Sequence, residues 1–191
     1  MKITISIDQV LRDFLSQFDY VYKKYKHNNG EDFDVNTITD FNLLSHYDFA
    51  GRYELNKFLH EEASLEIFGH ADLMYDNLSH KFNKFLVEIY DEEEYDVELV
   101  SKSFYKSIPA TLFFLSKINC TCNKIRFIND DENECDEETT ILITANPISL
   151  DNKKENVKYI KIKAPYNSNS ECELEYENIM EVFDNFEKII K

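Results

Sequence analysis

The chain has 191 residues, of which 43% are hydrophobic and 30% are charged, the composition of a folded globular protein. Its 21 lysines and arginines stand against 37 aspartates and glutamates, a formal net charge of −16, so direct binding to nucleic acid or to an anionic membrane would work against the field of the protein. Only three glycines occur, which excludes the glycine-rich phosphate loops of nucleotide-binding enzymes and the glycine-flanked nucleophile turn of serine hydrolases.

The chain begins with a predicted strand and a predicted helix. Residues 2–7 alternate isoleucine with other side chains and predict a strand that ends at Asp8. From Val10 to Tyr25, apolar residues recur at spacings of three and four, which predicts a helix with a broad apolar face. Asp8, just before this helix, is a candidate N-cap, and Asn-Asn-Gly at 28–30 is expected to end the helix.

The next stretch is predicted to be entirely helical. The apolar spacing predicts helices over residues 41–49, 53–68 and 73–90, with breaks at two of the three glycines. The acidic run at 91–96 that closes this stretch is expected to be a solvated turn.

After this turn the pattern changes to strands that alternate with helices or loops. We predict strands at 97–100, 124–128, 141–144 and 157–162, helices at 107–117 and 179–190, and an acidic loop at 129–138. Strands separated by such crossovers indicate an α/β fold with a Rossmann-like parallel sheet covered on both faces. Ligand sites in such sheets lie beyond the carboxyl ends of the strands, here residues 6–10, 101–106 and 144–147.

At the first of these strand ends the chain reads Ser6-Ile7-Asp8-Gln9-Val10-Leu11-Arg12-Asp13-Phe14. The segment resembles the first motif of the haloacid-dehalogenase-like (HAD) phosphohydrolases, in particular their capped 5'-nucleotidase-like members, in which an apolar strand precedes D-x-D-G-V-L-x-D-F. The shared Val-Leu-x-Asp-Phe fixes the alignment. The resemblance places Asp8 at the family's general acid/base and Ser6 at the position of its nucleophile.

A second strand end is similar to another motif of that family. The segment Glu98-Leu99-Val100-Ser101 resembles the strand that ends in a phosphate-binding hydroxyl, which would be Ser101. The resemblance implies a phosphate-clamping lysine nearby, and either Lys102 or Lys106 could stand near that position.

The last motif is altered, as the first one is. The segment from Ile141 to Pro147 resembles the strand that ends in two acids, but Thr144 and Ala145 stand in their place. Taken over the whole chain, the resemblance implies a HAD-like core at residues 1–26 and 96–191. It also implies an all-helical cap inserted after the first strand and helix, at residues 27–95.

These substitutions remove the family's chemistry. In the family an aspartate attacks phosphorus, and Mg²⁺ bound by that carboxylate and by an acid of the last motif neutralises the phosphoryl oxygens. A serine hydroxyl is a poor nucleophile unless a base activates it, and Mg²⁺ prefers an octahedral set of oxygens that includes a carboxylate. With Ser6, Thr144 and Ala145 in place, Asp8 is the only acid of these motifs. We expect a pseudoenzyme with vestigial site positions, no metal and no cofactor.

A scaffold that keeps its strands and cap but loses its catalytic acids indicates a structural or interaction role. The Asn-, Lys- and Ile-rich, Gly-poor composition and the segment 107–117 are similar to virion proteins of crAss-like tailed phages of gut bacteria. That resemblance implies a ring protein, a connector in the neck or tail, made in the host cytoplasm and located in the virion. Its partners would be other virion proteins and copies of itself, joined through two different faces of one subunit.

Two alternatives stay open. Acids of the cap or of the 129–138 loop could replace the missing ligands and give a Mg²⁺-dependent nucleotide phosphohydrolase that needs Asp8. The acidic chain could also act as a decoy that occupies a nucleic-acid-binding protein, an interaction that salt would weaken.

The remaining candidate groups point to structural roles. The four cysteines lack the spacing of a zinc site and are expected to be free thiols: Cys120, Cys122, Cys135 and Cys172. His60, Glu61, Glu62 and Glu66 lack the H-E-x-x-H pattern, so they are expected to form a solvated helix face. No apolar run approaches the roughly 18 residues of a membrane span, and the first residues lack the apolar region of a signal peptide, so neither is expected.

Overall fold

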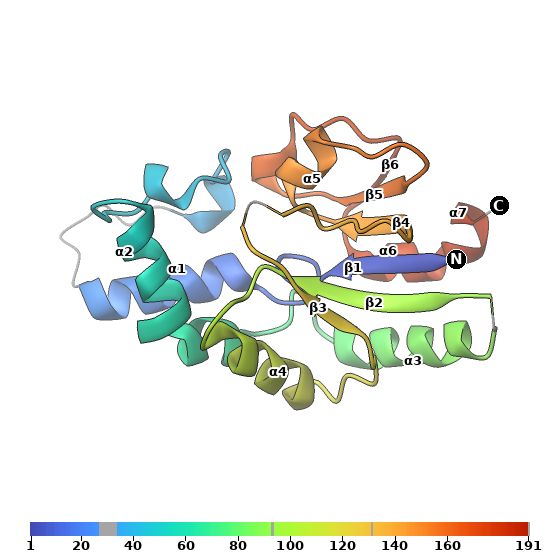
Figure 1. The fold of residues 1–191 in the computed structure, drawn as a ribbon, viewed down its shortest axis with the longest axis horizontal. Coiled ribbons are helices and arrows are strands. Elements are labelled where there is room, and N and C mark those ends of the chain that lie inside the picture. The colour runs from blue at the N-terminus through green and yellow to red at the C-terminus, as the bar shows by residue number, and fades with distance from the viewer. Residues whose placement is uncertain (27–33, 93, 131, 191) are drawn as a thin grey trace.

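The computed structural model describes residues 1–26, 34–92, 94–130 and 132–190, and its centre is a sheet of six parallel strands in the order β3-β2-β1-β4-β5-β6 (Figure 1). The strands are β1 (Lys2–Ser6), β2 (Asp96–Ser101), β3 (Ile125–Phe127), β4 (Thr139–Thr144), β5 (Lys158–Ile162) and β6 (Leu174–Tyr176). The five predicted strands are confirmed within one or two residues. The sixth, β6, was not predicted, because three partly exposed residues are too few to show an alternating pattern.

Helices flank this sheet, so the predicted α/β class with a Rossmann-like parallel sheet is confirmed. The α-helices are α1 (Phe14–Lys26), α2 (Arg52–Lys57), α3 (Leu78–Tyr90), α4 (Ser107–Lys117), α5 (Pro147–Asp151), α6 (Ile179–Asp184) and α7 (Phe186–Ile189). Short turns of 3₁₀ helix are η1 (Val35–Thr37), η2 (Leu43–Ser45) and η5 (Pro165–Asn167), and π-helical turns are η3 (Phe58–Glu62) and η4 (Leu65–Gly69). The predicted helix 107–117 is confirmed, whereas the predicted helix 179–190 is divided at Asn185.

One face of the sheet is apolar. Ile3 and Ile5 of β1 are completely buried there, and side chains of α3, α4, α6 and α7 belong to the same cluster. Strand side chains alternate between the two faces, so the isoleucines at every second position create this surface. It forms the main core of the molecule.

The opposite face of the sheet carries a smaller apolar cluster, with Leu142, Tyr159 and Leu150 of α5, and beside it an ionic network. Lys2 forms ion pairs with Asp136 and, at 3.2 Å, with Glu98. Arg126 Nε lies 2.8 Å from the carboxylate of Glu98 and 3.7 Å from that of Asp136. Thr4 Oγ1 adds a hydrogen bond of 3.0 Å to Thr139 Oγ1. These contacts fix the acidic segment between β3 and β4 against the sheet.

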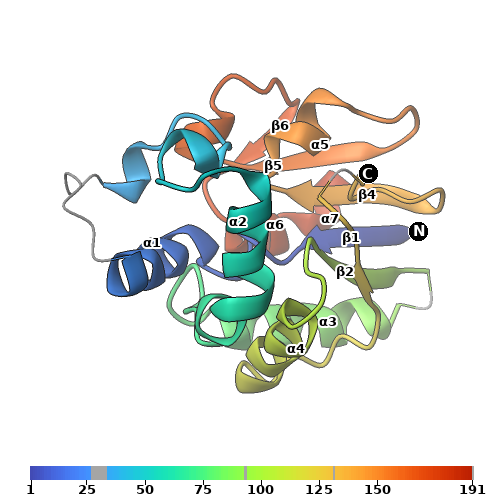
Figure 2. The same ribbon diagram turned by 60° about the vertical axis from the view of Figure 1, so that its left-hand side comes forward.

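The segment between α1 and α3 forms a second apolar cluster, beyond the carboxyl ends of the strands (Figures 1 and 2). Rings of α1, of η3 and of the segment after η2 pack together there; Phe18, for example, meets Tyr47 edge to face at a centroid distance of 4.7 Å. This cluster also contains Ala110 of α4. It holds the segment in place above the strand ends.

The helices predicted for this segment are only partly right. The region 41–49 contains a single 3₁₀ turn, η2, and the region 53–68 contains α2 followed by the π-helical turns η3 and η4. The third predicted helix, 73–90, begins only at Leu78, after Asn77 adopts a left-handed conformation with φ of 64°. Its buried side chains belong to the main core with the sheet, whereas α2, η3 and η4 belong to the second cluster. The expected end of α1 at residues 28–30 lies outside the described residues.

The thiols and the helices are consistent with two further expectations. All four cysteines are free. Within the described parts of the chain, the helices are too short and too polar to cross a membrane.

The Asp136 network gives a pH-dependent prediction. Burial alone would raise the pKa of the Asp136 carboxyl, but hydrogen bonds from Lys2 and Thr139 hold it well below its usual range. A carboxyl with a lowered pKa contributes stability that is complete above the pKa of the unfolded chain, about 4, and is lost as the pH falls further. We expect Asp136→Asn to lower the free energy of unfolding by about 1–3 kcal/mol near neutral pH.

The measurement is thermal unfolding followed by circular dichroism between about pH 7 and pH 2; the difference between wild type and variant should be constant above about pH 4 and should narrow as the pH falls below that value. Glu137→Gln, an exposed change in the same segment, is the matched control and should have no effect. A difference between wild type and Asp136→Asn that stays constant into acid would contradict the role of this carboxylate.

Candidate functional site

The site is built on the turn that joins β1 to α1. The Gln9 N–H donates to the Arg12 carbonyl at 2.8 Å, and the N–H groups of Leu11 and Arg12 donate to the Ile7 carbonyl at 3.0 and 2.9 Å. Gln9 adopts a left-handed conformation with φ of 60°. This closed turn delays the start of α1 to Phe14, which corrects the predicted helix start near Val10.

The N-cap expected at Asp8 is wrong, because Asp13 takes this role at the start of α1. The N–H of Ser16 donates to Asp13 Oδ1 at 3.2 Å, so Asp13 satisfies the first turn of α1. The Asp8 side chain is instead committed to Arg12, which donates to Asp8 Oδ1 from Nε at 2.8 Å and from Nη2 at 2.6 Å. Asp8 is therefore part of an ion pair and not of a helix cap.

Arg12 is completely buried, and its guanidinium donates hydrogen bonds to three different parts of the chain. Besides the pair with Asp8, its Nη1 donates to the Phe68 carbonyl and to Thr111 Oγ1, each at 2.9 Å. The guanidinium also lies 4.9 Å from the ring centroid of Phe68 and 5.2 Å from that of Phe114. Burial lowers the pKa of Arg12, and the charge of Asp8 opposes that shift.

The end of β2 adds a chain of hydroxyls. Ser101 Oγ donates to Asp8 Oδ2 at 3.1 Å and lies 2.9 Å from Ser103 Oγ. Ser103 Oγ lies 3.0 Å from Thr111 Oγ1, which accepts from Arg12. Both oxygens of Asp8 are thus engaged, one by Arg12 and the other by Ser101.

The structure brings two of the five site positions expected from the sequence, Asp8 and Ser101, to the wall of one cavity. The other three, Ser6, Thr144 and Ala145, are buried at the same edge of the sheet. Ser6 Oγ has no hydrogen-bond partner in the described part of the chain, and Thr144 Oγ1 donates to Glu134 Oε2 at 2.7 Å.

Of the two candidate lysines, Lys102 lines the cavity and Lys106 is exposed elsewhere. The Lys102 ammonium donates to the Asp130 carbonyl at 2.5 Å, so it is already engaged by the loop that follows β3. The position of Lys102 beside the cavity is the one that a phosphate-binding lysine would need, but its contact is to a backbone oxygen.

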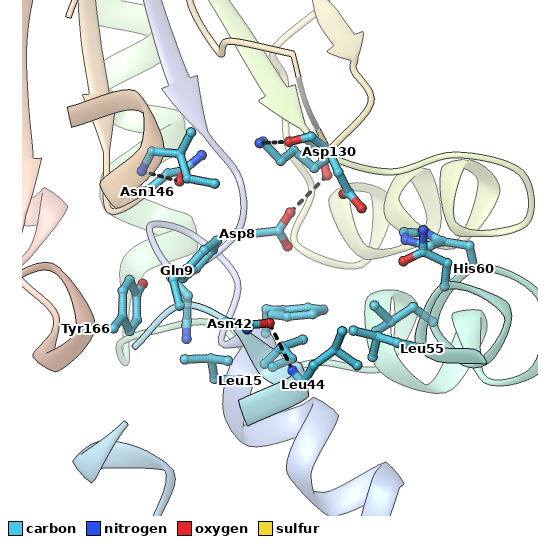
Figure 3. A pocket seen from close by; sticks show the side chains of 18 of the residues that line it. Asp8, Gln9, Leu15, Asn42, Leu44, Leu55, His60, Asp130, Asn146 and Tyr166 are labelled. Atoms are coloured by element: carbon cyan, nitrogen blue, oxygen red, sulfur yellow. Dashed lines mark hydrogen bonds between the residues drawn. The ribbon is translucent and has the colours of Figure 1, made fainter. Parts of the chain in front are cut away.

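The cavity has a volume of about 510 Å³, which is within the range of small-molecule sites. Figure 3 shows Asp8 between Gln9 and Tyr166 on one side and His60 on the other. The other polar residues of the wall are Asp40, Asn42, Arg52, Asn56, Ser101, Lys102, Asp130, Glu134 and Asn146. The rest of the wall is apolar: Phe14, Leu15, Phe41, Leu43, Leu44, Leu55, Leu59, Phe68, Val100 and Ile148.

His60 is buried in this wall, which corrects the solvated helix face expected for it. Its ring stacks on Phe104 at a centroid distance of 3.6 Å, and its Nδ1 lies 2.7 Å from Ser107 Oγ. Burial lowers the pKa of His60 to about 4, which the charge of Asp8 only partly opposes, so the ring is neutral at physiological pH. Glu61 and Glu62 are exposed, and the described residues contain no group of three acids, histidines or cysteines that could hold a metal ion.

Four residues of the site were not identified from the sequence: Gln9, Arg12, Glu134 and Tyr166. Arg12 lies inside an apolar run, and its hydrophobic surroundings were the one available signal that its charge is buried. Glu134 lies in an acid-rich loop, where no pattern distinguishes a buried carboxylate from its exposed neighbours. Tyr166 comes from η5, far along the chain, so only the fold brings it to Asp8.

Comparison of the sequence with protein-family models and with curated proteins found no match. The class of protein therefore follows from fold and site alone. It is an α/β protein with an all-parallel sheet and a partly apolar cavity at the carboxyl ends of its central strands, the usual position for a ligand in such folds.

The buried ion pair makes the second prediction. Replacing Arg12 with methionine keeps most of the side-chain volume but leaves the acceptors on Asp8, Phe68 and Thr111 without their donor. We expect Arg12→Met to lower the free energy of unfolding by about 3–5 kcal/mol, because breaking a buried pair leaves uncompensated polar groups.

Chemical denaturation measures this difference, with Arg52→Met as the matched control. Arg52 is exposed at the start of α2, so its replacement should cost less than about 0.5 kcal/mol. Equal costs for the two variants would show that the buried guanidinium does not organise the site.

Proposed function

We propose that the protein is a catalytically inactive, HAD-like protein that acts through its shape and surface, as a connector or tail-ring component of a phage virion. The observation that carries the loss of activity is the state of the residues at the nucleophile and acid/base positions. Ser6 is buried, and Asp8 is held by Arg12 and Ser101.

The surroundings of Ser6 support this reading. A serine attacks phosphorus only when a base within hydrogen-bond reach takes its proton. Among the described residues, Ser6 Oγ has no hydrogen-bond partner at all, and its side chain does not line the cavity. A substrate in the cavity would therefore meet no activated hydroxyl at that position.

The state of Asp8 supports it as well. A general acid or base must exchange a proton with the substrate near neutral pH. Two donors of the buried Arg12 guanidinium occupy Oδ1 of Asp8, and the Ser101 hydroxyl donates to Oδ2, so hydrogen bonds within the protein engage both oxygens. The geometry thus favours a carboxylate that holds structure over one that transfers protons.

The surface is compatible with an assembly role. Phe113 of α4 and Leu65 of η4 are each about half exposed, and both approach Gly69, so they form one apolar patch. Exposed apolar side chains that lie together are a surface suited to a protein contact. Two different faces of one subunit are what a closed ring requires.

One observation favours the second candidate, an altered nucleotide phosphohydrolase. Glu134 of the acidic loop places a carboxylate at the cavity, beside Thr144, where the family has acids. This is the replacement ligand that such an enzyme would need. The described residues supply only Asp8 and Glu134 as candidates there, and no group of three potential ligands surrounds them.

The third prediction separates the two candidates. Purified protein with Mg²⁺ should show neither heat of metal binding in calorimetry nor turnover of p-nitrophenyl phosphate or nucleoside monophosphates above background. Each missing factor of ten in rate corresponds to about 1.4 kcal/mol of barrier, so the loss of nucleophile and metal should leave nothing measurable. Mg²⁺-dependent turnover that disappears in both Asp8→Asn and Glu134→Gln would favour the phosphohydrolase.

The fourth prediction tests the assembly role. If the patch at Leu65 and Phe113 joins subunits, the wild-type chain should self-associate with rising concentration in sedimentation velocity, and Phe113→Glu should stay monomeric, because burying an unpaired charge opposes association. Val87→Glu places the same charge on an exposed position of α3 and is the control. A wild-type chain that is monomeric at every concentration would contradict a ring built from its own copies through this patch.

A further inference from the structure

The cavity at the strand ends contains polar atoms that the fold itself leaves without partners. The side-chain oxygen of Gln9 and the hydroxyl of Tyr166 are both buried, and neither has a hydrogen-bond partner among the described residues. Both residues line the cavity, on the same side of Asp8 (Figure 3). A buried polar group without a partner costs about 1–3 kcal/mol, so such groups in a cavity indicate that something else completes them.

The cavity also contains a carboxylate without a cation. Glu134 is only 6% exposed, and its Oε2 accepts a hydrogen bond from Thr144 Oγ1. None of the described lysines or arginines forms a salt bridge with it: Arg126, the neighbouring cation, donates to the backbone carbonyl of Glu134 and to Glu98. Buried carboxylates are normally paired, so Glu134 differs from Asp8, whose pair is complete.

Glu134 and the two atoms without partners share one chemistry. The carboxylate of Glu134 and the amide oxygen of Gln9 accept hydrogen bonds, and the Tyr166 hydroxyl can accept one too. Burial raises the pKa of Tyr166, and the negative charges of Glu134 and Asp8 raise it further, so this hydroxyl is neutral and faces a negative field. A complementary ligand has to donate hydrogen bonds and to carry positive charge.

The apolar part of the wall determines what the uncharged part of such a ligand can be. Leu15, Leu44, Leu55 and Phe68 supply an apolar surface opposite the polar groups, and a cavity of about 510 Å³ accommodates one or two rings. Anions are disfavoured, because four acids line the cavity, Asp8, Asp40, Asp130 and Glu134, against two basic residues, Arg52 and Lys102.

We propose that this cavity binds a small organic cation, an amine or amidine on an aromatic or aliphatic body, with the cationic head donating to Glu134, Gln9 and Tyr166. The inference rests on the cavity and its unsatisfied acceptors, and it holds whether or not the chain belongs to a virion. It differs from phosphate binding in the sign of the charge that the ligand carries.

The test uses four probes with the same ring, titrated calorimetrically into the full chain: benzamidine, benzamide, benzoate and phenyl phosphate. Benzamidine should bind saturably, and the neutral benzamide should bind about tenfold more weakly or worse, because it lacks the charge that pairs with a carboxylate. Benzoate and phenyl phosphate should give no saturable signal. Absence of benzamidine binding, or equal binding of benzamide or benzoate, would overturn the proposal.

Variants locate the site. Glu134→Gln should weaken benzamidine binding about tenfold or more, whereas Glu137→Gln, the same change on an exposed residue of the same loop, should leave it unchanged. Tyr166→Phe removes a hydroxyl that has no hydrogen-bond partner among the described residues, so this variant should keep the wild-type melting temperature. Its affinity for benzamidine should nevertheless be several-fold lower than that of the wild type. If Glu134→Gln does not fold, the Tyr166→Phe variant still tests the site. The site would be refuted if both variants fold and bind benzamidine with the affinity of the wild type. The phosphatase assay is independent of these outcomes.

Discussion

The geometry of the strand ends depends on one constraint, the burial of the Arg12 guanidinium. A charge completely removed from water must be paired and hydrogen-bonded, and each bond that Arg12 makes ties down a different part of the chain. Asp8 fixes the turn after β1, the Phe68 carbonyl fixes η4, and Thr111 fixes α4. The inserted segment between α1 and α3 is thereby anchored to the sheet through a polar centre as well as through its own apolar cluster.

The same constraint separates two groups of polar residues in the site, those bonded around Asp8 and those whose side chains take no part in these bonds. Arg12 donates to one oxygen of Asp8 and Ser101 donates to the other, so both oxygens of this carboxylate are used in hydrogen bonds within the protein. Among the described residues, the side-chain oxygen of Gln9 and the hydroxyl of Tyr166 have no hydrogen-bond partner, and Glu134 forms no salt bridge; all three line the same cavity. Because the two proposals depend on different side chains, the proposed inactivity at Asp8 and the proposed binding of a cation are independent of each other.

The sequence predicts the repeating parts of the fold and not the parts that depend on single side chains. Alternation at residues 2–7 and short apolar runs elsewhere identified five strands, and helix 107–117 was right at both ends. The helix start at Val10 was wrong because Val10 and Leu11 are buried in a closed turn, where apolar residues mimic helical spacing. Asp8 and Ser101 could be brought together because both follow parallel strands. Tyr166 could not, since its approach requires the order of β4 and β5 in the sheet.

The acidic segment between β3 and β4 shows most clearly why charge has to be interpreted together with position. Its acids look alike in the sequence, yet Asp136 is paired with Lys2 on one face of the sheet, Glu137 is exposed, and Glu134 is buried with no salt bridge to a described lysine or arginine. The ion pairs of Asp136 hold the segment against the sheet only two residues away from Glu134, which keeps that carboxylate out of solvent. The same short segment thus uses one acid to hold itself against the sheet and places another in the wall of the cavity, so the role of each acid follows from its position and not from its charge alone.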